Sequence, residues 1–468
     1  MKVSSSNKLL KISGKPPSFY GTVRLPPSKS YLHRALFVSA LANSKSVLTK
    51  CGPNTNEDIQ ATVRVLGALG AKIRMSRKQE GSVEIIPGSN KSSNVELDAG
   101  GSGTTARFLI PFSALSPNGT RVTIVGNESL SNRPMQTIFE PLSKLGVKVK
   151  SINENGKLPV TIEGGGIDGG SCEIDGSTSS QFVSSLLISC TKAAGDTVIS
   201  IKNPEDQVSE PYIEATIQVI RGFGFRIRGE KSSSGRYTSF GIPGKQSVNG
   251  CEFAVPGDMS SGAALIGACI AVRGRVKLTN TGAGKFHQPD SAVIPLARHF
   301  GARVLIDGDS MKVSVQDKRV RRRITLNLRD SPDLVPTIAG VAAATETRIS
   351  ISKIGHLRIK ESDRIGVLSR ELCKMGVKTE QTESSLSVLG ACAKERPETT
   401  FLSPEGDHRM LMAFAIAGLS GKFGTIFIRD PGCVKKSYPS FITDLQKLCH
   451  EKSSLKIVNT QRSTSIAS

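Results

Sequence analysis

The chain has 468 residues, of which 38% are hydrophobic, enough for two or three domains with sizeable cores. This composition excludes disorder for most of the chain, and no run reaches the roughly 18 consecutive apolar residues of a membrane-spanning helix. The net charge of +22 indicates anionic partners, either nucleic acid or phosphorylated small molecules. The nine cysteines form no C-x-x-C pair, which argues against a zinc site. We expect a cytoplasmic protein, because the first residues lack the apolar stretch of a secretory signal.

One pattern occurs six times along the chain, a turn rich in Gly, Ser, Asp or Pro followed directly by an apolar helix of small residues. In chain order, the turns fall near Ser28, Ser102, Ser179, Asp258, Asp333 and Asp407, roughly 75 residues apart. A short β-rich run follows each helix, such as SVLTK after the first and TRVTIVG after the second. We therefore predict six copies of one α/β unit.

A second, amphipathic helix follows the β-rich run in several copies. These helices end at glycines, namely Gly67/Gly70, Gly146, Gly224 and Gly376. Glycine is favoured there because the residue after a helix often takes the left-handed conformation. The sixth copy lacks this glycine. The predicted unit is thus helix, strand, helix, strand.

The size of the repeat predicts the domain organisation. A unit of about 75 residues is too large for a thin solenoid, but three units can close around a pseudo-threefold axis. We expect an α/β protein with two domains of three units each, one at 28–254 and the other at 1–27 plus 255–448, followed by a basic tail at 449–468. The first helix of each unit is apolar nearly all round, which indicates that it lies buried inside its domain.

The helix N-termini predicted by this arrangement form a candidate site. Parallel buried helices direct their free N–H groups and partial positive charge toward one end of each domain. Such ends bind anions, and here they also carry hydroxyl, amide, cationic and carboxylate side chains. Ser, Thr and Asp are also good N-caps, so a purely structural role remains open for each residue.

The residues at these turns resemble those of the 5-enolpyruvylshikimate-3-phosphate synthase family, in order and over almost the whole length. The matching motifs are Ser28-Lys29-Ser30 with Arg34, Gly103-Thr104 with Arg107, Arg133-Pro134, Ser179-Ser180-Gln181, Ser209 with Tyr212, Asp333, Lys360-Glu361-Ser362-Asp363-Arg364, Asp407-His408-Arg409 and Lys436-Ser437-Tyr438-Pro439. The resemblance implies the enolpyruvyl transferase fold, with two domains of three α/β units and the active site in the interdomain cleft.

The resemblance also implies the reaction. The family transfers the enolpyruvyl group of phosphoenolpyruvate to the 5-hydroxyl of shikimate 3-phosphate by addition and elimination, and it releases phosphate. One group must take the hydroxyl proton and another must donate a proton to the methylene carbon. The implied partners are these two substrates, with no nucleic acid and no membrane, and we expect no cofactor, no metal and a monomer.

The family motifs assign roles by position. The implied catalytic residues are Lys29, Asp333 and Glu361. The implied phosphoenolpyruvate site consists of Lys29, Gly103, Arg133, Gln181, Arg364, Arg409 and Lys436. The implied shikimate 3-phosphate site consists of Ser30, Arg34, Ser179, Ser180, Gln181, Ser209, Tyr212, Asp333, His356 and Lys360.

Alternatives remain for both the function and the individual residues. The sister enolpyruvyl transferase acting on UDP-N-acetylglucosamine carries Lys-Asn in the first turn and usually a cysteine beside the phosphoenolpyruvate arginine, whereas this chain has Lys29-Ser30 and no cysteine near Arg133. A nucleic-acid-binding protein or an inactive family member is the other alternative. We interpret the basic run 318–323 as a solvated edge. His356 and Gly101 stand where many relatives carry Asn.

Overall fold

The computed structural model describes residues 8–16, 18–52, 56–76, 80–90, 92–315, 323–391, 396–450 and 454–459. The basic run 318–323 lies outside the described residues except for Arg323. The chain divides into two compact units. Unit 1 comprises Met1–Pro26, Gly257–Lys285 and Pro289–Ser468, and unit 2 comprises Pro27–Pro256 and Phe286–Gln288. The two units are described separately below.

Each unit contains three four-stranded sheets, one for each sequence repeat. The third repeat illustrates the pattern. Its first two strands, β10 (Gly170–Asp175) and β11 (Thr197–Lys202), are parallel and are joined through helix α6 (Ser180–Ser189). Strand β13 (Tyr237–Ile242) is antiparallel to β11, and β12 (Arg228–Lys231) forms the edge. The predicted helix, strand, helix, strand unit was therefore incomplete, because each sheet also has a strand parallel to the first and a closing hairpin.

Unit 2 is built from repeats one to three. Its other sheets are β14 (Glu252–Ala254), β3 (Ser46–Thr49), β5 (Ser82–Ile86) and β4 (Lys72–Ser76), and β6 (Asn94–Asp98), β7 (Arg121–Val125), β9 (Val160–Glu163) and β8 (Val149–Ser151). Its helices are α1 (Lys29–Ala40), α2 (Glu57–Ala68), α3 (Gly103–Ser113), α4 (Glu128–Ser131), α5 (Phe139–Lys144), α6 and α7 (Pro211–Gly222), with 3-10 turns η1 (Gln136–Ile138), η2 (Cys190–Lys192) and η3 (Pro204–Asp206).

Unit 1 is built from repeats four to six. Its sheets are β16 (Ala302–Asp307), β17 (Ser310–Val315), β15 (Arg275–Thr279) and β2 (Tyr20–Arg24); β18 (Arg323–Asn327), β19 (Arg348–Ser352), β21 (Ser385–Ala391) and β20 (Val377–Thr382); and β22 (Thr399–Leu402), β23 (Thr425–Arg429), β1 (Lys8–Ser13) and β24 (Leu455–Asn459). Its helices are α8 (Met259–Val272), α9 (Val293–His299), α10 (Leu334–Thr345), α11 (Arg364–Lys374), α12 (His408–Leu419) and α13 (Phe441–Cys449), with 3-10 turns η4 (Pro289–Ala292), η5 (Gly355–Ile359) and η6 (Pro431–Lys436).

Strands distant in sequence complete three of the sheets. Strand β14, from the end of the first half, pairs in parallel with β3 of repeat one. Strand β2, from the N-terminal segment, pairs in parallel with β15 of repeat four. Strand β24 pairs with β1, so residues 455–459, which the sequence analysis placed in a basic tail, form an edge strand of unit 1.

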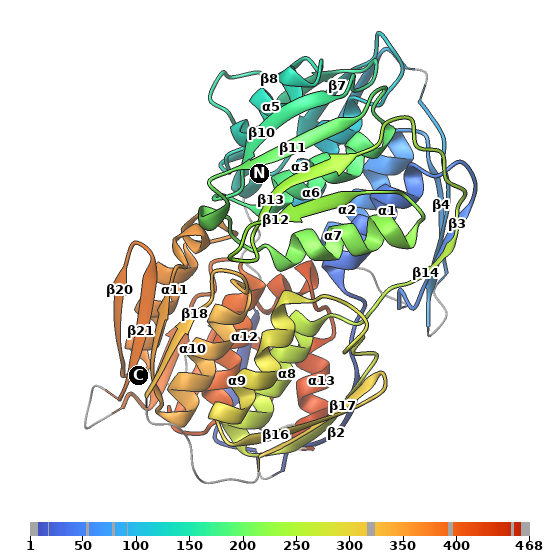
Figure 1. The fold of residues 1–468 in the computed structure, drawn as a ribbon. Helices are drawn as coiled ribbons and strands as arrows, with labels where there is room; N and C mark the ends of the chain where they lie inside the picture. Colours follow the sequence, from blue (N-terminus) through green and yellow to red (C-terminus); the bar gives the residue numbers. More distant parts are fainter. Residues whose placement is uncertain are drawn as a thin grey trace. The chain divides into compact units, whose positions relative to one another are not determined.

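The first helix of each repeat lies inside its unit, as the sequence predicts. Helices α8, α10 and α12 contact one another in unit 1, and α1, α3 and α6 do so in unit 2. Figure 1 shows α8, α10 and α12 side by side, with strands of the sheets outside them. Small residues permit this packing: a Cβ added at Gly340 in α10 would lie 2.5 Å from the carbonyl oxygen of Ala413 in α12.

The expected left-handed residues after the second helices are present. Gly70, Gly146, Gly224 and Gly376 have φ angles of +106°, +85°, +88° and +77°. The sixth repeat, which has no glycine there, uses His450 at the end of α13, with φ of +52°. The turn geometry is therefore kept where the favoured residue is absent.

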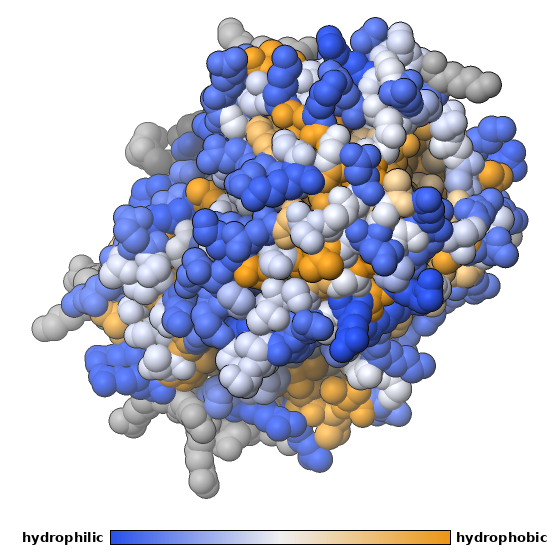
Figure 2. Space-filling model, turned by 45° about the horizontal axis from the view of Figure 1, so that its top comes forward, coloured by the Kyte–Doolittle hydropathy of each residue, from blue (hydrophilic) through white to orange (hydrophobic). Residues whose placement is uncertain are grey.

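Hydrophilic side chains predominate on the face drawn in Figure 2, with smaller hydrophobic patches among them. None of the described helices combines the length and the apolar character that crossing a bilayer would require.

Candidate functional site

The residues that precede the inner helices are N-caps in five of the six repeats. The side chains of Ser28, Ser102, Ser179, Asp258 and Asp407 each accept a hydrogen bond from a backbone N–H in the first turn of the following helix. Asp333, which precedes α10, makes no such bond, and its backbone is already helical. The capping alternative is therefore confirmed at five positions, and at Asp333 the carboxylate is available for other partners.

Lys29 is the first residue of α1 in unit 2. Its ammonium group lies 2.8 Å from a carboxylate oxygen of Asp58, at the start of α2, and both side chains are largely shielded from solvent. Asp58 did not emerge from the sequence, because nothing in the local pattern shows that the starts of α1 and α2 meet. The ion pair holds the lysine at the N-terminal end of the inner helices.

Arg34 is fully buried one turn further along α1 and connects three helices of unit 2. Its guanidinium donates to the carbonyl oxygens of Ser30 and Tyr212, at 2.8 and 3.0 Å. It also donates to the hydroxyls of Thr216, at 2.7 Å, and Ser184, at 3.4 Å. Burial lowers the pKa of Arg34 to about 10. Arg34 thus fixes the positions of two other predicted site residues, Ser30 and Tyr212.

Gln181 connects the N-terminal ends of α3 and α6. Its amide nitrogen donates to the hydroxyl of Thr104 at 3.0 Å, and its amide oxygen accepts from Arg107 at 2.9 Å. Gly103, the first residue of α3, brings the backbone close to another cation, since a Cβ at this position would lie 3.0 Å from Nη1 of Arg133. These contacts bring Gly103, Arg133 and Gln181 together at one end of unit 2.

The predicted phosphate cradle consists of buried hydroxyls. Ser179, Ser180 and Ser209 are each at most 5% exposed. Ser209 has a φ angle of +57°, a conformation that costs a non-glycine residue about 1–3 kcal/mol and is found mainly at functional sites. Its carbonyl accepts from the N–H of Tyr212 at 3.0 Å, which starts α7 beside it.

In unit 1 the guanidinium of Arg364 binds three carboxylates. Nη1 donates to Asp333, Nη2 to Glu361 and Nε to Asp407, each at 2.8 Å. The Arg364 side chain is only 2% exposed, so these bonds are shielded from water. The starts of α10, α11 and α12 therefore meet at one arginine. Asp407 was predicted only as a turn residue, and its bond to Arg364 could not be found from sequence spacing.

Two further cations lie at the same end of unit 1. Arg409, in the first turn of α12, donates to the second oxygen of Asp333 at 2.7 Å. Lys436, the last residue of η6, donates to the carbonyl oxygen of Gly406 at 3.0 Å, just before α12. The structure thus brings Asp333, Glu361, Arg364 and Arg409 into one network, and it holds Lys436 at the start of the same helix as Arg409.

The charges of this network control its titration. Burial alone would raise the pKa of Asp333, but Arg409, Arg364 and Lys360 outweigh it and hold this pKa below its ordinary value. Burial and then the charge of Lys360 lower the pKa of His356 to about 3, so this imidazole is neutral at physiological pH. The Nε2 atom of His356 is buried without a hydrogen-bond partner among the described residues.

Each unit therefore gathers its predicted residues at the N-terminal end of its inner helices. Unit 2 supplies cations, an amide and hydroxyls, which suit phosphate and carboxylate groups. Unit 1 supplies carboxylates paired with arginines, which can exchange protons and clamp a planar carboxylate.

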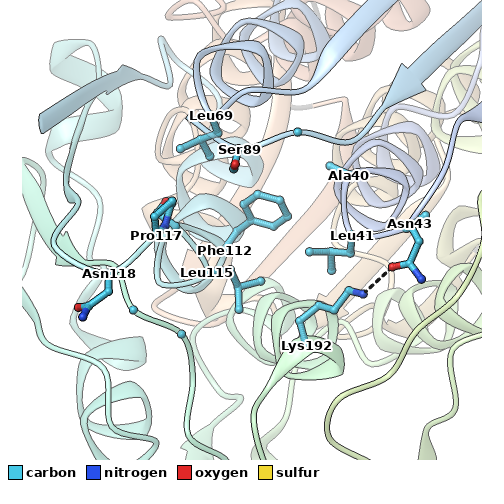
Figure 3. Close-up of a pocket in the computed structure, with 15 residues that line it drawn as sticks. Ala40, Leu41, Asn43, Leu69, Ser89, Phe112, Leu115, Pro117, Asn118 and Lys192 are labelled. Carbon is cyan, nitrogen blue, oxygen red and sulfur yellow. Dashed lines mark hydrogen bonds between the residues drawn. The ribbon is translucent and has the colours of Figure 1, made fainter. Parts of the chain in front are cut away.

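A separate cavity of about 480 Å³ lies at the opposite end of the unit 2 helices. Its lining includes Ala40, Leu41, Phe112 and Leu115, at the carboxyl ends of α1 and α3, roughly 18 Å along α1 from Ser28. Figure 3 shows the Lys192 side chain at this cavity, with its ammonium bonded to Asn43. The described lining has no carboxylate, so this cavity lacks the proton-transfer groups of the N-terminal ends.

Solved structures show the fold class. An EPSP synthase from Acinetobacter baumannii covers 96% of this chain and 100% of its own length, with a TM-score of 0.75 and 24% identity. The enolpyruvyl transferase NikO from Streptomyces tendae covers 97% of this chain and 99% of its own length, with a TM-score of 0.73 and 19% identity. The chain has the enolpyruvyl transferase fold.

Sequence comparison then gives the family. The family model described as EPSP synthase (3-phosphoshikimate 1-carboxyvinyltransferase) matches residues 15–445. The 3-phosphoshikimate 1-carboxyvinyltransferase of Methanosarcina mazei is 35% identical over 435 residues, which is 92% of this chain and 96% of the relative. That of Korarchaeum cryptofilum is 36% identical over 439 residues, which is 93% of this chain and 98% of the relative. The chain belongs to the EPSP synthase family.

Proposed function

We propose that the groups at the inner-helix N-termini of both units act on the same two substrates. As an EPSP synthase, the enzyme transfers the enolpyruvyl group of phosphoenolpyruvate to the 5-hydroxyl of shikimate 3-phosphate and releases phosphate. The observation that carries the proposal is the behaviour of Asp333, which leaves its helix uncapped and binds Arg364 and Arg409 instead. A carboxylate kept ionised beside two arginines suits proton transfer next to an anionic substrate better than it suits a structural cap.

Phosphoenolpyruvate is proposed to bind through cations of both units. Lys29, Arg133 and Lys436 suit its phosphate, with the backbone of Gly103 and the amide of Gln181 close by. The carboxylate is assigned to Arg364 and Arg409, because a guanidinium can donate two parallel bonds to a carboxylate.

Shikimate 3-phosphate is proposed to bind through hydroxyls and a separate set of cations. Ser179, Ser180 and Ser209 would cradle its phosphate, with Lys360 and the neutral ring of His356 completing the set. Ser30 and Arg34 are assigned to its carboxylate. Gln181 and Tyr212 are assigned to the ring, and Asp333 to the 5-hydroxyl.

Proton transfer is assigned to Asp333, Glu361 and Lys29. In the free enzyme Asp333 is a weak base, since Arg409 and Arg364 hold its pKa low. When those arginines turn to the substrate carboxylate, Asp333 loses cationic partners and its pKa rises, so it becomes able to take the hydroxyl proton. Glu361 and Lys29 are proposed to handle the proton at the enolpyruvyl methylene carbon. We also propose a cytoplasmic monomer.

Calorimetric titration with shikimate 3-phosphate tests the joint use of both units. Ser209→Gly in unit 2 and Lys360→Met in unit 1 should each weaken binding by about 10-fold to 100-fold, the value of one hydrogen bond to a charged group. Ser209→Gly keeps the fold, because glycine adopts the left-handed conformation without strain.

Two matched variants serve as controls for this titration. Asn203→Gly replaces another left-handed residue of unit 2, with φ of +49°, and Lys378→Met removes an exposed lysine of unit 1. Both should leave the affinity unchanged. Weakened binding in only one of the two test variants would mean that shikimate 3-phosphate does not use both units.

A further inference from the structure

A carboxylate that the proposed mechanism does not use is buried beside the catalytic network of unit 1. Asp290 lies in the short turn η4 and is only 1% exposed. One of its oxygens accepts a hydrogen bond from the hydroxyl of Ser260, in the first turn of α8. The other oxygen is buried without a hydrogen-bond partner among the described residues.

The structure holds Asp290 next to Asp333. The hydroxyl of Ser331, two residues before Asp333, donates to the carbonyl oxygen of Pro289 at 2.8 Å. The turn η4 is thereby tied to the start of α10 by Ser331 and to the start of α8 by Ser260. The charged groups that act on Asp290 are Asp333 on α10, Arg409 on α12 and Asp258 before α8.

We propose that Asp290 is a positioning residue that holds a proton beside Asp333 and Arg409 and that weakens phosphoenolpyruvate binding when it loses this proton. The inference rests on the proposed roles of those two residues. A buried carboxyl with one unpartnered oxygen is far less costly when neutral than when charged. Burial, followed by the charge of Asp333, raises the pKa of Asp290 to about 7, against an opposing effect of Arg409.

The consequence for substrate binding follows from the charges. Protonated Asp290 leaves Arg409 to be shared between Asp333 and the substrate carboxylate. Ionised Asp290 adds a negative charge to the same pocket, so it attracts Arg409 and repels an anionic substrate. A charge interaction in such a partly buried site changes affinity by about tenfold or more.

The test compares the wild-type enzyme with Asp290→Asn, which has the shape of the protonated acid and cannot ionise. The KM for phosphoenolpyruvate is measured across the neutral pH range at saturating shikimate 3-phosphate. The ratio of the wild-type KM to the variant KM should rise by about tenfold as pH increases through about 7. Titration of the substrates cancels in this ratio. A ratio that does not change with pH, whatever its size, overturns the proposal.

Ser260→Ala gives an independent variant. The hydrogen bond from Ser260 lowers the pKa of Asp290, so its loss should move the rise in KM to higher pH. Glu371→Gln is the matched control, because it removes another buried carboxylate of unit 1, one paired with Arg370 and Lys374. It should lower Tm and leave the pH dependence of KM unchanged. An unshifted rise in Ser260→Ala contradicts the assignment to Asp290.

Thermal unfolding without substrate separates this proposal from the proposed function. The native state keeps a proton that the unfolded chain releases near the ordinary pKa of 3.8, so wild-type stability falls as pH rises from 3.8 to about 7 and then stays level. The Tm of Asp290→Asn minus that of the wild type should therefore rise by several degrees across this window. A constant difference would show that Asp290 holds no proton, whether or not the enzyme transfers the enolpyruvyl group.

Discussion

Asp333→Asn is expected to lower kcat by about 10²-fold to 10⁴-fold while the KM values change by less than about tenfold. The amide keeps the shape of the side chain but cannot accept the hydroxyl proton. The two arginines that bind Asp333 at 2.8 and 2.7 Å keep an oxygen acceptor, so the fold should survive. Steady-state kinetics with both substrates varied, alongside circular dichroism, make the measurement.

Asp444→Asn is the control for this variant. Asp444 is also buried in unit 1, and its hydrogen bonds go to Tyr438, Ser440 and Lys447. We expect its kcat to stay within about threefold of the wild type, since no proton-transfer group is removed. If Asp333→Asn instead raised KM and left kcat intact, Asp333 would be a binding group and the base would have to be sought elsewhere.

Lys29→Ala is expected to reduce kcat/KM for phosphoenolpyruvate by about 10²-fold to 10³-fold or more, through loss of a fixed cation and a proton-transfer group. The lysine is largely buried and paired with Asp58 at 2.8 Å, so its charge is held in place before substrate binds. The measurement is initial-rate kinetics of the purified variant.

Two companion variants identify the origin of the Lys29 effect. Asp58→Asn keeps the ammonium and removes its anchor, so we expect a loss of no more than about tenfold. Lys144→Ala removes a solvent-exposed ion pair with Glu140 and should change nothing measurable. Equal losses in Lys29→Ala and Asp58→Asn would assign the effect to the ion pair and not to the lysine itself.

The sequence predicts those parts of the fold that depend on local patterns. The inner helices follow from apolar periodicity and from their caps, and the left-handed glycines at 70, 146, 224 and 376 follow from turn chemistry. The strands preceding the inner helices were not predicted, since runs as short as Glu252–Ala254 resemble loops until a distant strand pairs with them. His450 shows the same limit, because its left-handed conformation is imposed by a packed turn and not by its residue type.

For the site, the sequence located the helix starts but not their side-chain partners. Lys29, Arg364 and Arg409 were found from the family motifs. Asp58 and Asp290 were not found, because their importance depends on contacts with residues more than 25 positions away, Lys29 and Ser260 respectively. Long-range pairing decides which of several similar Asp residues caps a helix and which one binds arginine.

The most direct test of the account is release of inorganic phosphate from phosphoenolpyruvate by the purified wild-type protein. We expect release when shikimate 3-phosphate and phosphoenolpyruvate are both present, in a one-to-one ratio with the enolpyruvyl product, and no release from either substrate alone. UDP-N-acetylglucosamine should not replace shikimate 3-phosphate. Absence of phosphate release from the folded protein with both substrates, or release with the nucleotide sugar instead, would contradict the account.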